Sequence, residues 1–153
     1  MAFQFRFEKL LSYRQHLREK AELKLARAQQ NLKRARLLLE KDEESLHLTR
    51  KRLESRLKKR IVSEELQNHA DYMTDLKERI RADTSLVVER ERIIEEKREE
   101  LLLKAKQYRV IEKLKEKDYE KWKHIQLQAE QKRMNEVAVS RHGRPSWGKE
   151  KSS

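Results

Sequence analysis

Residues 66–108 read LQNHADYMTDLKERIRADTSLVVERERIIEEKREELLLKAKQY, and this stretch decides the fold. Its apolar residues recur every seven positions, as Leu66, Met73, Ile80, Val87, Ile94, Leu101 and Tyr108. An apolar stripe with this period keeps one edge of an α-helix against a partner helix, under a slight left-handed supercoil. The stretch therefore predicts one helix of a coiled coil.

A second stripe with the same period precedes it. Its leucines are Leu25, Leu32, Leu39, Leu46 and Leu53, and the complementary core position carries Ala21, Ala28 and Ala35. Small side chains at alternate core positions let two helices approach closely, which suits antiparallel pairing within one chain. Asp42, Thr49 and Arg56 follow at the alanine positions, so we expect this seam to loosen toward its end.

A break in register separates the stripes, because steps of seven from Leu53 miss Leu66 by one residue. Between them Ser63 is a candidate helix N-cap, and the two glutamates that follow it suit the first turn of a helix. A helix therefore ends before Ser63 and another begins there. One continuous helix with a stutter in its heptads is the alternative.

These signals predict an all-α fold, a long antiparallel two-helix coiled-coil hairpin over residues 1–142. We expect a helix over about 8–60, a turn at about 61–63 and a second helix over about 64–141. Both glycines and the only proline lie in residues 143–153, which predicts a short disordered, flexible C-terminal tail.

Composition excludes several other classes. Charged residues make up 43% of the 153 and apolar residues 36%, with a mean hydropathy of −1.12, which disfavours a globule around one core. The sequence has no cysteine, so disulfides and zinc ribbons are not expected. Its apolar runs are too short for a membrane span, and no segment resembles a cleaved secretion signal.

Chemistry is not expected from this sequence either. A glycine-rich phosphate loop is impossible where the glycines lie only in the tail, and a pair of helices has little interior for a catalytic pocket. The five histidines show no i, i+4 pairing, so no metal site is expected. We predict a protein that is not an enzyme and has no cofactor. Its net charge of +12 suggests an anionic partner.

Aromatic residues are expected to meet at the open end of the hairpin. With a turn near residue 62, facing residues have numbers that add up to about 124. Phe7 then faces the region near residue 117, and Phe3 and Phe5 lie near Tyr119 and Trp122. The group is either a hydrophobic plug that stops the ends from fraying or a surface that docks in another protein.

A basic segment precedes the expected turn. Residues 50–60 hold seven lysines and arginines against one glutamate. The segment is either a solvated basic turn or a site for the phosphates of nucleic acid. No stacking platform, recognition helix or zinc finger accompanies it, so nucleic acid is not the expected partner. A basic nucleic-acid-binding coiled coil remains an alternative function.

The opening Phe3–Arg14, which reads FQFRFEKLLSYR, resembles the start of the FliJ family. These are the soluble coiled-coil proteins of the bacterial flagellar type III export apparatus. Residues 21–29 (AELKLARAQ), residues 66–76 and residues 130–138 (EQKRMNEVA) continue the likeness. It covers roughly residues 3–142.

The resemblance implies a non-enzymatic central stalk that binds and stimulates the hexameric flagellar export ATPase. It also implies coupling to the cytoplasmic part of the membrane export gate, a link to export chaperones and a role in flagellum assembly. The expected location is cytoplasmic, peripheral on the cell membrane at the flagellar base, with no direct membrane insertion. The stalk protein of an injectisome is the alternative within this class.

The same likeness suggests contact residues. The open end would enter the ATPase ring with Phe3, Phe5, Phe7, Tyr119 and Trp122. A patch early in the second helix would face the export gate with Tyr72, Leu76, Arg79 and Asp83. Leu76 stands beside the core stripe, so a place in the seam between the helices is the alternative for that residue.

Overall fold

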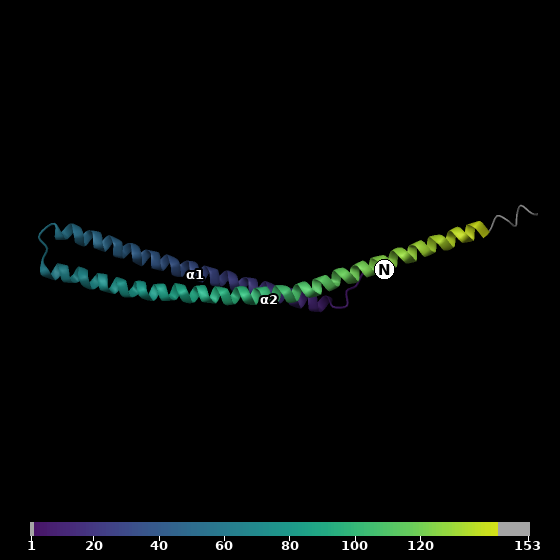
Figure 1. The fold of residues 1–153 in the computed structure, drawn as a ribbon, viewed down its shortest axis with the longest axis horizontal. Coiled ribbons are helices and arrows are strands. Elements are labelled where there is room, and N and C mark those ends of the chain that lie inside the picture. The colour runs from purple at the N-terminus through teal and green to yellow at the C-terminus, as the bar shows by residue number, and fades with distance from the viewer. Residues whose placement is uncertain (1, 144–153) are drawn as a thin grey trace, which may run out of the picture. The chain divides into compact units, whose positions relative to one another are not determined.

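Two long helices dominate the computed structural model, which describes residues 2–143 (Figure 1). Helix α1 spans Glu8–Leu57 and helix α2 spans Ser63–Gly143. The described residues contain no β-strand. The predicted all-α fold of two long, packed helices is confirmed. Apart from Gly143, the predicted tail lies outside the described residues.

The chain divides into two compact units, Met1–Gln15 with Lys106–Ser153, and His16–Ala105. In the unit His16–Ala105, α1 and α2 run side by side in opposite directions and are joined by residues 58–62 (Figure 1).

The buried side chains of the unit His16–Ala105 recur with the heptad period, although Leu76 lies beside the second stripe and Leu66, the first residue of that stripe, is 39% exposed. The buried apolar residues are Ala21, Ala28, Leu32, Ala35 and Leu46 on α1, with Leu76 and Ile94 on α2. Ala28, Leu32 and Ile94 form one core cluster. The period of seven is therefore the period of the seam, as predicted.

Ion pairs across this seam report its register. Lys24 Nζ lies 3.6 Å from Glu100 Oε1, and Arg36 Nη2 lies 3.1 Å from Glu91 Oε1. The paired residue numbers add up to 124 and 127, so the predicted antiparallel register is confirmed in this unit. Exposed pairs of this kind add little stability, which leaves the apolar seam as the main source of cohesion.

The predicted loosening of the seam is absent at Asp42 and Thr49 and is found only close to the turn, where Arg56 is half-buried and Leu66 is 39% exposed. Asp42 is 8% exposed and Thr49 only 4%, like the alanines before them. Thr49 can be buried because its Oγ1 donates a hydrogen bond to the backbone oxygen of Ser45 at 2.7 Å. Leu76, at 1% exposed the most buried large side chain described, fills the α2 side of the seam.

The first helix ends earlier than the expected residue 60. After Leu57 the N–H of Lys59 donates to the backbone oxygen of Arg56 at 3.0 Å, which closes a turn. The Arg56 side chain then ties α1 to α2, since its Nε and Nη2 donate to the two carboxylate oxygens of Glu65 at 2.8 Å each. These hydrogen bonds lower the pKa of Glu65. This clamp favours a turn at residues 58–62.

The second helix begins at Ser63 and not after it. The carbonyl of Val62 accepts a hydrogen bond from the N–H of Leu66 at 3.1 Å, so the residue before Ser63 already receives the first helical bond. Glu64 and Glu65 lie in the first turn, where a negative charge is favourable beside the helix N-terminus.

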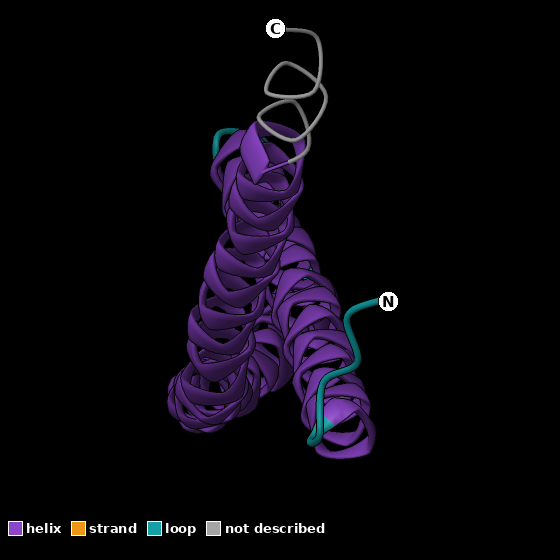
Figure 2. Ribbon diagram, turned by 90° about the vertical axis from the view of Figure 1, so that its right-hand side faces the viewer, coloured by secondary structure: helices purple, strands orange, loops and turns teal. Residues whose placement is uncertain are grey.

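In the other unit, residues 2–7 precede α1 without helical structure (Figure 2). Phe3, Phe5 and Phe7 are partly or fully buried, whereas Gln4 and Arg6 are exposed. The three phenylalanines therefore face the packed cluster of Phe5, Leu11 and Ile111, while the polar side chains between them face solvent. In this unit every residue of α2 from 123 to 142 is exposed.

Candidate functional site

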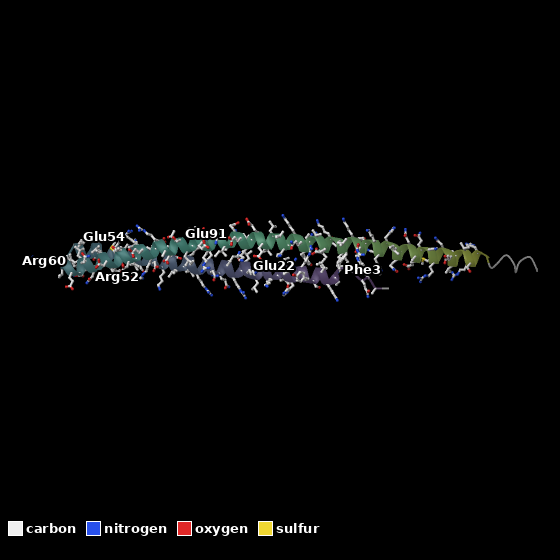
Figure 3. The ribbon with its side chains drawn as sticks, turned by 90° about the horizontal axis from the view of Figure 1, so that it is seen from below. Phe3, Glu22, Arg52, Glu54, Arg60 and Glu91 are labelled. Atoms are coloured by element: carbon white, nitrogen blue, oxygen red, sulfur yellow. The ribbon has the colours of Figure 1, made fainter. Side chains whose placement is uncertain are left out.

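Five aromatic residues gather in the unit Met1–Gln15 with Lys106–Ser153, as the register predicts. They form the aromatic cluster, which consists of Phe3, Phe5, Phe7, Tyr119 and Trp122. The ring of Phe3, labelled in Figure 3, lies 5.3 Å from that of Tyr119 and 5.8 Å from that of Trp122 between centroids. Tyr119 and Trp122 stack on each other at 5.8 Å.

The aromatic cluster has a buried part and an open part. Phe5 is 8% exposed and packs with Leu11 and Ile111, and its ring lies 5.9 Å from that of Phe7. Tyr119 is 42% exposed. Phe5 is buried as a plug would be, while Tyr119 remains accessible to solvent.

Phe5 packs with Leu11 and Ile111, nearer the turn between the helices than the expected contact with Tyr119 and Trp122. A turn of the chain before α1 accounts for this position, because the N–H of Glu8 donates a hydrogen bond to the backbone oxygen of Phe5 at 3.3 Å. The rule that facing numbers add up to about 124 therefore fails for Phe5, whereas Phe3 still meets Tyr119 and Trp122.

Polar contacts hold the start of α1 on α2. Lys115 Nζ lies 2.9 Å from Glu8 Oε2, and Arg14 Nη1 donates to the backbone oxygen of Gln107 at 2.8 Å. These residue numbers add up to 123 and 121, so the predicted register also holds in this unit. These two contacts, one from an α2 side chain and one from an α1 side chain, hold the helices together next to the buried part of the aromatic cluster.

The predicted gate patch also consists of exposed and buried residues. Tyr72 is 44% exposed and Arg79 is exposed, so both side chains are available to a partner. Leu76 is 1% exposed and Asp83 is 8% exposed, which places both in the seam with α1. A partner that contacts this patch from solvent meets the first two residues.

Asp83 faces a second carboxyl, that of Asp42, across the seam. Both residues are 8% exposed, and Asp83 Oδ2 has no hydrogen-bond partner among residues 2–143. A side-chain hydrogen bond with Asp42, burial and the negative charge of Asp42 raise the pKa of Asp83, while Arg79 opposes the shift. The closeness of the two carboxyl groups therefore raises the pH at which Asp83 gives up its proton.

The sequence analysis names Asp42 and Asp83 separately and misses them as a pair. The signal was present, since their numbers add up to 125 and both stand at core positions of their stripes. Applying the register to every polar core position would have brought them together.

Two further searches concern the described residues as a whole. Nowhere in residues 2–143 do three or more His, Asp or Glu side chains gather where they could hold a metal ion. No helix within that range has a segment long and apolar enough to cross a bilayer.

Antiparallel helices joined by a heptad seam, with aromatic and charged side chains on the outside, define a coiled-coil scaffold. A family profile described as Flagellar FliJ protein matches residues 3–146. The chain belongs to the FliJ family and is a component of the flagellar export apparatus. Comparisons with curated proteins and with solved structures found no match.

Proposed function

We propose that this protein is the central stalk of the flagellar export ATPase. In this role it binds the hexameric ring, stimulates ATP hydrolysis there and couples the ring to the cytoplasmic part of the membrane export gate. It performs no reaction itself and is needed for flagellum assembly, and so for motility and chemotaxis. It works in the cytoplasm, peripheral to the cell membrane at the flagellar base, and export chaperones are further partners.

The open part of the aromatic cluster is the observation that carries this proposal. Phe3, Tyr119 and Trp122 contact one another and stay partly exposed, above a base where Phe5 is 8% exposed. Aromatic residues dominate the binding energy of many interfaces, and rings that are already held in place lose little entropy on binding. This surface is suited to insertion into the ring.

The export gate is proposed to contact the exposed residues of the second patch. Tyr72 offers an aromatic ring and Arg79 a cation on the outer face of α2. Leu76 contributes from inside the seam, where it packs that part of α2 against α1, and Asp83 lies in the seam opposite Asp42. Their effect on gate binding is indirect.

The test of ring binding compares Trp122→Ala with Ile125→Ala. Ile125 is an apolar residue of the same helix, 59% exposed and outside the aromatic cluster. We expect Trp122→Ala to raise the concentration needed for half-maximal ATPase stimulation about 30-fold, as for an interface residue worth about 2 kcal/mol, while Ile125→Ala leaves it unchanged.

Circular dichroism of both variants shows whether Trp122 binds the ring or only stabilises the helix ends as a hydrophobic plug. Retained helicity with lost stimulation supports the proposal, whereas equal stimulation by both variants, or a collapse of helicity in Trp122→Ala, contradicts it.

For the gate, Tyr72→Ala and Arg79→Ala should weaken binding to its cytoplasmic part. Glu78→Ala, a change of an exposed neighbour, is the matched control.

A further inference from the structure

The turn of the unit His16–Ala105 carries an excess of unpaired positive charge. Residues 50–65 hold seven basic and three acidic side chains. Among the described residues Arg56 alone of these basic side chains has an ion pair, with Glu65. Within residues 2–143 the six others make no ion pair and are exposed, namely Arg50, Lys51, Arg52, Lys58, Lys59 and Arg60. This differs from the middle of α2, where arginines such as Arg92 are paired with glutamates.

Apolar side chains are exposed among these cations. Leu57 is 53% exposed, Val62 67% and Leu66 39%. They lie on the last turn of α1, in the turn itself and on the first turn of α2. A single exposed leucine is ordinary. Three exposed apolar side chains within ten residues, among unpaired cations, offer contacts to both apolar and anionic groups of a ligand.

The surface is held in place before any ligand binds. The Arg56–Glu65 clamp, with two hydrogen bonds of 2.8 Å, fixes the chain on both sides of the turn. Figure 3 labels Arg60 at the end where the two helices are joined, with Arg52 and Glu54 a little farther from that end. Arg52 precedes Leu57 by about 8 Å of helix, less than the Debye length of about 10 Å at 0.1 M salt. The positive charge of Arg52 therefore still attracts an anionic surface that contacts the turn.

We propose that residues 50–66, the basic turn, bind the surface of an anionic phospholipid bilayer. The cations meet the headgroup phosphates, and Leu57 and Val62 reach the boundary with the acyl chains. Basic clusters next to apolar side chains have this affinity. The contact is interfacial and does not span the bilayer. It adds a binding surface to the peripheral membrane location proposed above, and it does not depend on the proposed contacts with the ATPase ring or the export gate.

The apolar component favours a bilayer over nucleic acid. No Phe, Trp or Tyr occurs in residues 50–66, so the basic turn has no ring on which a base could stack. The phosphates of nucleic acid would leave the apolar side chains of Leu57 and Val62 in water. A bilayer can contact the cations with its headgroups and these two side chains with its acyl chains.

Vesicle flotation with the full chain tests the charge component. We expect binding to vesicles containing 30% phosphatidylglycerol, no binding to phosphatidylcholine vesicles, and weakening as NaCl rises from 0.05 to 0.5 M. The triple change of Lys58, Lys59 and Arg60 to glutamine should weaken binding about 100-fold, from an approximately fivefold effect per cation. The same change at Lys113, Lys117 and Lys121, exposed lysines without an ion pair among residues 2–143, is the control, and an equal loss there overturns the proposal.

A fluorophore that senses its environment tests the apolar component. Because the chain has no cysteine, Val62→Cys can be labelled alone, and Val88→Cys, at a residue 60% exposed, gives a control on the outside of α2. We expect a blue shift with anionic vesicles for the first label only. No shift at position 62, or tighter binding to duplex DNA than to the vesicles, would overturn the proposal.

Discussion

The carboxyl pair Asp42–Asp83 leads to a specific prediction about stability. Asparagine in place of Asp83 keeps the shape of the side chain, and its amide can donate a hydrogen bond to Asp42 at every pH. In the native chain that donor exists only while the pair holds a proton. We therefore expect Asp83→Asn to stabilise the fold at pH 8 and to have little effect at pH 4.

The size of the effect follows from the burial of the pair. A buried polar atom without a partner costs about 1–3 kcal/mol, and Asp83 Oδ2 is such an atom in a side chain 8% exposed. For a chain of this length 1 kcal/mol changes Tm by roughly 2–4 °C. The expected gain at pH 8 is therefore roughly 2–12 °C.

The direction of the pH dependence follows from the raised pKa of Asp83. Between its ordinary value of 3.8 and the raised value, the folded chain binds the proton more tightly than the unfolded chain does. The stability of the native chain therefore falls as the pH rises through this interval. Asparagine does not titrate, so the variant should lack this part of the slope.

Thermal unfolding followed by far-UV circular dichroism, at steps from pH 4 to pH 8, measures both effects. Asp75→Asn, a change of an exposed carboxyl on the same helix, is the control and should keep the native slope. If Asp83→Asn lowers Tm at pH 8, or keeps the slope of the native chain, the shared proton is refuted.

Three other results are expected. Cysteines in place of Ala28 and Ile94, which share one buried cluster, should cross-link within one chain on a non-reducing gel; links only between chains would contradict the antiparallel pairing. Leu76→Ala should cost about 2–5 kcal/mol in a urea titration, because the side chain is 1% exposed; an unchanged midpoint would place it outside the seam. Arg56→Ala should speed tryptic cleavage in the turn, and an unchanged rate would mean that the clamp to Glu65 does not hold it.

Periodicity carried most of the information about the fold. The leucine and alanine stripes predict the helices, their antiparallel pairing and the register that brings Lys24 to Glu100. This works because a heptad seam repeats one simple contact many times. The aromatic cluster was predictable for the same reason.

The remaining features depend on contacts that no repeat encodes. Thr49 is buried because it bonds to the backbone of its own helix, and α1 ends at Leu57 beside the Arg56 clamp to Glu65. Phe5 departs from the expected contact because the chain turns before α1, where the N–H of Glu8 donates to the backbone oxygen of Phe5. Each case is a local change of geometry or hydrogen bonding, and a pattern of residue types shows where such a change can occur but not which one does.

The exposed stretch of α2 after Trp122 has a consequence for how this protein melts. A helix that continues from a packed segment bears no nucleation cost, because the preceding turns already supply its first hydrogen bonds. Residues 123–142 should therefore unwind gradually from their far end as temperature rises, ahead of the cooperative transition of the seam. Amide hydrogens there would exchange fastest, and a molecule that grips this stretch would slow them first.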